Sequence, residues 1–117
     1  MSRILLVEDD IWSKDCYEGW LQNHDCVWAG DAQLALNKLD ESQIDLIILD
    51  MFLPNSNGVQ LLNILASYDD FLKIPVIILS TSPPSKKTLK AYGVKDVLDK
   101  TTITKVDFVK AVNNALL

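Results

Sequence analysis

The chain has 117 residues, of which 49% are hydrophobic and 23% charged, and its net charge at neutral pH is −5. This length is typical of one domain, so we expect residues 1–117 to form a single domain. The negative charge leaves no basic stripe for a phosphate backbone and argues against direct nucleic-acid binding, and no apolar run approaches the ~18 residues of a membrane span.

The first residues, Met1-Ser2-Arg3, lead straight into a strand-like run without signal-peptide architecture, so we expect a cytoplasmic protein. Cys16 and Cys26 have neither metal-type spacing nor a disulfide framework. Both are predicted to be buried or partly buried free thiols.

Short apolar runs alternate with longer segments of helical period, which indicates βαβ units and a parallel sheet. The predicted strands are residues 3–7, 26–29, 45–49, 76–79 and 96–98. Strands buried on both faces are continuously aliphatic, so the first, third and fourth are placed in the centre of the sheet. The second strand is predicted at an edge.

Five helices are predicted between and after these strands. They cover residues 11–23, residues 32–39, residues 58–67, a segment from Pro83-Pro84 to about Gly93, and a segment that begins with the capping-box-like run 104–107. Apolar side chains recur at helical spacing and are expected to face the sheet. These are Tyr17, Trp20 and Leu21; Ala32, Ala35, Leu36 and Leu39; Leu61, Leu62 and Leu65; and Val106, Val109, Val112 and Leu116.

Polar side chains stand at the end of four of these hydrophobic runs. Glu8 and Asp9 follow the first, Asp50 the third, Ser80 the fourth and Lys100 the last. Ligands of an open parallel sheet bind beyond the carboxyl ends of its strands, so these residues should meet there. Three carboxylates, a hydroxyl and an ammonium suit a divalent cation and a phosphoryl group, which predicts a phosphate-handling signalling module.

The same residues belong to four segments with recognisable motifs. These are residues 4–10 (ILLVEDD), residues 45–54 (DLIILDMFLP) followed by Gly58, residues 75–80 (PVIILS), and residues 93–100 (GVKDVLDK). In this order and spacing they resemble the response-regulator receiver domain, the phosphoacceptor module of two-component signalling, over the whole chain. The resemblance is to a chemotaxis-regulator-like, stand-alone receiver.

The resemblance implies an α/β, doubly wound, flavodoxin-like fold with a five-stranded parallel sheet of order 2-1-3-4-5 and five helices. It implies that Asp50 is the phosphoacceptor. Magnesium would be bound by Glu8, Asp9, Asp50 and the backbone carbonyl of Phe52, all oxygen ligands. Phosphoryl oxygens would be contacted by Ser80 and Lys100, with Thr81 as a less favoured hydroxyl beside Ser80.

The resemblance also implies the partners. A histidine kinase or a phosphotransfer protein would donate the phosphoryl group, and a downstream protein would bind the phosphorylated form. No turnover of an external substrate is expected. One rival hypothesis is a receiver-like interaction module that is never phosphorylated. Another is an aspartyl-nucleophile phosphatase, but the second Asp that such an enzyme needs is replaced by Phe52.

Three positions depart from the family pattern. Val97 stands where the family commonly has Tyr or Phe, and Thr101 replaces the common proline after Lys100. A cis bond before a non-proline residue costs about 2.5–4 kcal/mol, so the Lys100–Thr101 bond is predicted to be trans. The spacing from Ser80 to Lys100 is about two residues shorter than usual, which predicts a shortened fourth helix or shortened flanks.

Other residues are assigned structural roles. Trp12, Trp20 and Trp28 are expected in the core or in grooves, and His24 in a partly exposed packing position. Asp10 is assigned to a solvated acidic loop.

Overall fold

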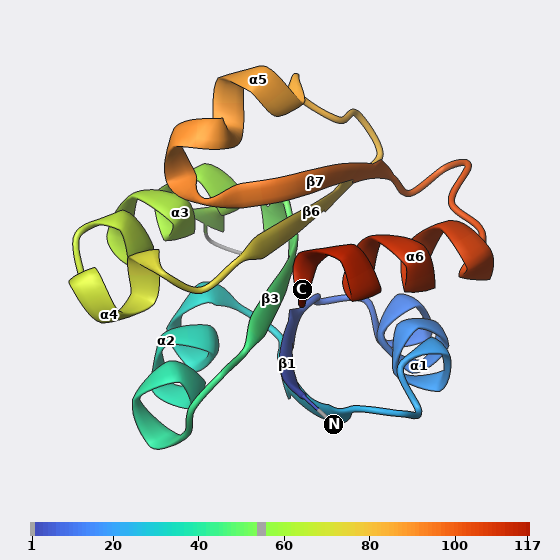
Figure 1. Ribbon diagram of the computed structural model, residues 1–117, viewed down its shortest axis with the longest axis horizontal. Coiled ribbons are helices and arrows are strands. Elements are labelled where there is room, and N and C mark those ends of the chain that lie inside the picture. The colour runs from blue at the N-terminus through green and yellow to red at the C-terminus, as the bar shows by residue number, and fades with distance from the viewer. Residues whose placement is uncertain (1, 54–55) are drawn as a thin grey trace.

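The computed structural model describes residues 2–53 and 56–117 and has a five-stranded parallel sheet at its centre (Figure 1). Its strand order is β2-β1-β3-β6-β7, which is the predicted order 2-1-3-4-5. The strands are β1 (Arg3–Val7), β2 (Asp25–Ala29), β3 (Leu46–Asp50), β6 (Val76–Ser80) and β7 (Val94–Asp99). The sequence did not predict the small antiparallel pair β4 (Phe52–Leu53) and β5 (Ser56–Asn57) that follows β3.

Helices cover both faces of the sheet, as a doubly wound fold requires. They are α1 (Ile11–Trp20), α2 (Ala32–Glu41), α3 (Gly58–Ala66), α4 (Asp69–Leu72), α5 (Lys86–Leu89), which continues into the 3₁₀ turn η1 (Lys90–Tyr92), and α6 (Lys105–Ala115). In Figure 1, α1 and α6 lie on one side of the sheet, whereas α2 and α3 lie on the other. None of the helices in the described chain is long and apolar enough to cross a membrane.

The burial of the strands explains which of them lie in the centre of the sheet. Every residue of β3 and β6 is buried, and so is every residue of β1 except Arg3. Alternate side chains supply two cores, so that Leu5 and Val7 pack toward α2 and α3 while Ile4 and Leu6 pack toward α1 and α6. The less buried β2 lies at an edge, as predicted.

Helix starts are set by side-chain caps. Asp10 accepts hydrogen bonds from the Ser13 amide (3.1 Å) and from its hydroxyl (2.8 Å), and Thr104 accepts from the Asp107 amide at 3.1 Å. Asp10 is exposed, as expected of a loop residue, but it also fixes the first turn of α1. That turn begins directly after the acidic pair Glu8 and Asp9, so the cap limits how far this pair can move.

Several predicted helix boundaries were wrong. The first helix ends at Trp20 and not at Asn23, because a turn follows in which the Leu21 amide donates to the carbonyls of both Tyr17 and Glu18. The predicted single fourth helix from Pro83 is instead a non-helical Pro83-Pro84 followed by α5 and η1. A proline disfavours helical geometry in the residue before it, so Pro84 keeps Pro83 out of a helix. The helical segment ends, as predicted, at Gly93, whose positive φ of 79° suits glycine.

Three side chains that were predicted to be buried or partly buried are exposed. Val106 is 75% exposed and Trp12 is 84% exposed, because α6 and α1 turn other residues inward, namely Phe108 and Tyr17. Cys16 is exposed, whereas Cys26 is partly buried as expected. Trp20 and Trp28 are partly buried, and the His24 imidazole is partly buried with its Nδ1 accepting the Ser2 amide at 3.3 Å.

The prediction of a trans bond after Lys100 is confirmed. No peptide bond among the described residues is cis, so the Lys100–Thr101 bond is trans. The helical segment before β7 is short, with four residues in α5 and three in η1.

The sequence did not assign Phe108 to the core. Its substitution is expected to cause the largest loss of stability among residues of α6. Phe108 is fully buried and its ring stacks on Tyr17 with centroids 5.1 Å apart. Phe108→Ala should lower the free energy of unfolding by roughly 3–5 kcal/mol, as deletions of buried aromatic rings do. Val106→Ala on the exposed side of the same helix should stay within about 0.5 kcal/mol of wild type. Urea unfolding measures both, and equal effects of the two substitutions would contradict this description of the core.

Candidate functional site at the carboxyl edge of the sheet

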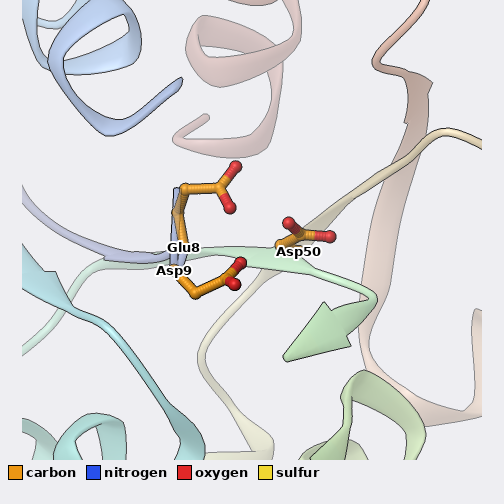
Figure 2. Close-up of side chains that lie close together, drawn as sticks. All are labelled: Glu8, Asp9 and Asp50. Atoms are coloured by element: carbon orange, nitrogen blue, oxygen red, sulfur yellow. The ribbon is translucent and has the colours of Figure 1, made fainter. Parts of the chain in front are cut away.

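Three carboxylates converge where β1 and β3 end. Glu8, Asp9 and Asp50 each place one carboxylate oxygen within 4.8 Å of the others. Figure 2 shows the three side chains pointing toward one shared space. Glu8 and Asp50 are buried, with 0% and 4% of their surface exposed, whereas Asp9 is exposed. The predicted meeting of these sequence-distant acids is therefore present.

Strand register explains this convergence. Val7 and Leu49 are partners in the pairing of β1 with β3, so Glu8, directly after β1, lies beside Asp50, the last residue of β3. The Asp50 side chain is further fixed by the Phe52 amide, which donates to its Oδ1 at 3.1 Å. The backbone of Phe52 is thus at the site, while its side chain is exposed. Pro54, which forms part of the motif around Asp50, lies outside the described residues.

Lys100 provides the positive charge of the site. Its Nζ lies 2.7 Å from Glu8 Oε1 and 3.0 Å from Asp50 Oδ2. The Lys100 amide donates to the carbonyl of Ser80 at 2.9 Å, which ties the end of β7 to the end of β6. One ammonium therefore bridges two buried carboxylates from different strands.

The charges at the site do not balance, and the pKa of Glu8 shows it. The pKa of Glu8 is raised from 4.5 to about 7, first by burial and then by the neighbouring Asp50, whose effect Lys100 only partly offsets. Burial opposes the charge on Lys100, but the hydrogen bonds with Glu8 and Asp50 hold its pKa above the ordinary value. Two carboxylates in one buried place favour an additional cation.

The two hydroxyl candidates differ in their surroundings. Ser80 is fully buried at the end of β6, and its Oγ accepts a hydrogen bond from the Ser82 amide at 3.1 Å. Thr81, the neighbouring hydroxyl, is exposed. The structure brings Ser80 to the same sheet edge as the acids and Lys100, which fits the preference for Ser80 over Thr81.

Sequence reasoning missed one contact of the acidic pair. The indole Nε1 of Trp28 donates to the backbone carbonyl of Glu8 at 2.7 Å. No motif could have revealed this contact, because it depends on how β2 pairs with β1.

Gly58 has a steric reason to be glycine. Its amide donates to the Met51 carbonyl at 2.7 Å, and a Cβ at this position would lie 2.8 Å from Met51 Sδ and 3.0 Å from Met51 Cα. The close approach holds the start of α3 against the segment that follows Asp50, so only glycine fits without displacement.

The donor set fits a hard divalent cation. Mg²⁺ requires oxygen ligands and is usually bound through one or two carboxylates together with water. The cluster supplies three carboxylates, and the exposed Asp9 leaves one side of it open to solvent. These residues could hold such an ion, and Lys100 is placed to answer the negative charge in its absence.

Comparison with known proteins identifies the family. Residues 4–113 match the family model of the response regulator receiver domain. The chain belongs to this family. Receiver domains are phosphoacceptor signalling modules of two-component systems and not classical enzymes, and they interact with histidine kinases or phosphotransfer proteins and with downstream partners. The expected family, fold and class of function are therefore confirmed.

Curated relatives are longer than this chain. It is 34% identical over 117 residues to the transcription factor prr1 of Schizosaccharomyces pombe, covering 98% of this chain and 22% of that protein. It is 31% identical over 102 residues to the phosphate regulon transcriptional regulatory protein PhoB of Escherichia coli, covering 84% of this chain and 44% of that protein. The receiver domain thus matches less than half of either relative.

Solved structures confirm the receiver fold. The chemotaxis response regulator CheY4 of Vibrio cholerae superimposes with a TM-score of 0.88 at 25% identity, covering 99% of each chain. The receiver domain of the sensor histidine kinase PA1611 of Pseudomonas aeruginosa has a TM-score of 0.86 at 21% identity, covering 98% of this chain and 97% of that one. That structure has a magnesium ion coordinated in its active-site cleft.

The raised pKa of Glu8 predicts that the metal-free protein loses stability as the pH rises. The folded pKa of about 7 exceeds the ordinary value of 4.5, so the folded state binds this proton more tightly than the unfolded state does. The free energy of unfolding should therefore fall between these two pH values, by roughly 3 kcal/mol at about 1.4 kcal/mol per pKa unit.

Urea unfolding in EDTA across this pH range measures the effect. Glu8→Gln is the matched control, because it removes the titrating group and keeps the side-chain shape. A wild-type profile parallel to that of Glu8→Gln would contradict the assignment.

Proposed function

We propose that the chain is a Mg²⁺-dependent receiver in which Asp50 accepts a phosphoryl group from the phosphohistidine of a kinase or phosphotransfer protein. One observation carries the proposal. The Asp50 carboxylate is fixed at a strand end, 3.0 Å from the Lys100 ammonium and within 4.8 Å of ligand oxygens of Glu8 and Asp9. A nucleophile, a charge-neutralising group and a candidate metal site thus share one edge.

The metal would be held by Glu8, Asp9, Asp50 and the backbone carbonyl of Phe52. When bound, Mg²⁺ would neutralise the negative charge that the carboxylates and the incoming phosphoryl group bring together, which is the main requirement of phosphoryl transfer. The burial of Glu8 and Asp50 supports this role, because two buried carboxylates with one lysine remain short of positive charge.

The transfer uses the side chain of Asp50 as the nucleophile. One of its carboxylate oxygens attacks phosphorus, a new P–O bond forms, and the P–N bond to the donor imidazole breaks, with its electron pair returning to the imidazole nitrogen. The Phe52 amide holds the other carboxylate oxygen through its bond to Oδ1 and so orients the attacking one.

Lys100 and Ser80 would then bind the transferred group. Lys100 exchanges its contact with Asp50 for a phosphoryl oxygen, and its ammonium is already within 3.0 Å of the carboxylate that becomes modified. The Ser80 Oγ accepts the Ser82 amide, so its own proton is available to donate to a second phosphoryl oxygen. The exposed Thr81 is the less favoured hydroxyl.

The output would be binding of a downstream protein, controlled by a charge change that shifts a two-state surface. We assign the response to Ser80 and the short α5–η1 segment, because Val97 has no ring to rotate inward. In this proposal residues 1–117 act as one receiver domain in the cytoplasm, without direct nucleic-acid contact and without turnover of an external substrate.

The alternative is a receiver-like module that works without phosphorylation. The short α5 and the valine at position 97 are its support, since they alter the segment through which receivers address partners. The complete set of acids and the lysine argue against it. Buried carboxylates are costly to a fold, and phosphoryl acceptance with a bound cation accounts for this cost.

Asp50→Asn should abolish phosphoryl acceptance and leave the fold intact, because the amide keeps the carboxylate's shape and loses its nucleophilic charge. The measurement is intact mass after incubation with acetyl phosphate and Mg²⁺, where wild type should gain one phosphoryl group transiently. Asp40→Asn on the exposed side of α2 is the control and should be labelled like wild type. A labelled Asp50→Asn protein with the adduct mapped to another residue would overturn the assignment, and an unlabelled wild type would favour the alternative module.

Mg²⁺ alone should stabilise the wild-type protein. Saturation to a hundred times the dissociation constant contributes about 2.7 kcal/mol, or roughly 10 °C in melting temperature for a domain of this size. Asp9→Ala should lose most of this shift, whereas Asp15→Ala, an exposed acid on α1, should keep it. Thermal melts with MgCl₂ and with EDTA test this, and an equal response of wild type and Asp9→Ala would disprove the metal site.

A further inference from the structure

Trp28 reaches from the edge strand β2 to the acidic pair. Its indole Nε1 donates to the Glu8 backbone carbonyl at 2.7 Å, at the short end of the range for N–H···O bonds. Trp28 pairs with Leu6 in the β1–β2 register, so the indole extends past the end of β1 to a residue beyond the strand.

With this contact, β2 makes two hydrogen bonds to the backbone of Glu8. The Glu8 amide donates to the Ala29 carbonyl at 3.1 Å, and the Glu8 carbonyl accepts from Trp28. Both peptide groups of Glu8 are therefore held by β2, although β1 itself ends at Val7. A side chain takes the place of the strand partner that the carbonyl would otherwise lack.

The indole is itself held in place. The ammonium of Lys14 on α1 lies 5.0 Å from the centroid of the Trp28 ring, and Lys14 is paired with Glu18 at 2.9 Å. Gly30 also lies beside the ring, because a Cβ at this position would be in van der Waals contact with Trp28 Cζ2 at 3.4 Å. Trp28 is thus packed between α1 and the end of its own strand.

Asp9 depends on this arrangement more than the other acids do. Lys100 holds the side chains of Glu8 and Asp50, and the Phe52 amide also holds Asp50. No hydrogen bond or ion pair with another residue in the described part of the chain fixes the Asp9 carboxylate. Its position therefore follows from the backbone that carries it, and the carbonyl bonded by Trp28 belongs to the Glu8–Asp9 peptide group itself.

We propose that Trp28 is a positioning residue for the metal ligands, acting through the Glu8–Asp9 peptide to aim the Asp9 carboxylate at the cation. The inference rests on the proposed function, because it presumes that Glu8, Asp9 and Asp50 hold Mg²⁺. It assigns to the edge strand a role that packing alone would not give it. It also connects Lys14, on the surface helix α1, to the metal site through one aromatic ring.

The experiment removes the N–H donor and keeps the ring. Replacing Trp28 by 3-benzothienylalanine substitutes sulfur for the indole nitrogen, and Trp28→Phe is a second variant without the donor. Isothermal titration with MgCl₂ measures the dissociation constant of folded protein, which should rise about two- to tenfold on loss of one hydrogen bond that orients a ligand. Replacing Trp20 by 3-benzothienylalanine is the control. Trp20 packs on Tyr17 and Phe108, so this replacement should leave the dissociation constant for Mg²⁺ unchanged.

A metal-free measurement separates this inference from the proposed function. The Glu8 amide donates to the Ala29 carbonyl and the Asp10 amide donates to Glu8 Oε2, so both are protected from exchange. Their proton exchange in EDTA should be faster in the Trp28 variants than in wild type and in the Trp20 variant. Faster exchange supports the positioning role even if wild type binds no Mg²⁺, a result that would defeat the metal proposal alone. Unchanged exchange, an unchanged dissociation constant, or an equal loss in the Trp20 variant would overturn the role of Trp28.

Discussion

The ammonium of Lys100 between the carboxylates of Glu8 and Asp50 is the interaction on which the site depends. It joins the ends of β1, β3 and β7 through contacts of 2.7 and 3.0 Å, and it does so in a buried place where an unpaired charge is costly. One cation cannot neutralise two buried carboxylates and the exposed Asp9 beside them. Burial, together with the neighbouring Asp50, raises the pKa of Glu8. Without a metal ion, the site therefore has less positive charge than its carboxylates require. In the proposed function, a bound cation or a modified Asp50 would change this charge balance at a point that three strands share, and the change could reach a distant surface through those strands.

The rest of the fold holds these groups at fixed positions. The aliphatic strands β1, β3 and β6 are buried on both faces, so their register has little freedom and the residues that follow them meet at one edge. Caps and close approaches then fix the loops. Asp10 starts α1 directly after the acidic pair, and Gly58 lets α3 begin against the backbone of Met51. The buried strands thus position a site in which two carboxylates share one ammonium.

The side of the molecule near β7 departs most from the family pattern. Val97 is partly buried at a place where a rotating ring is common, the segment between Ser80 and β7 holds only short helical turns, and the Lys100–Thr101 bond is trans. The acids and the lysine lie on the other strands and at the end of β7, and they are retained. In the proposed function, phosphoryl acceptance and the response of the partner surface would be carried by different parts of the fold, so the second could diverge while the first is kept.

Continuous aliphatic runs and strand-end acids are local patterns, so the sequence by itself determined which strands are central and which polar residues meet at the sheet edge. The family and the strand order followed from the resemblance that its motifs carry. The sequence also indicated that Ser80 and Lys100 join Glu8, Asp9 and Asp50. Only the tertiary structure decided that Lys100 bonds both buried acids, that Phe108 and not Val106 enters the core, and that Trp28 holds Glu8. Each of these depends on how elements pack against one another. A tryptophan on an edge strand carries no local sign of the residue, twenty positions away, to which its N–H will donate.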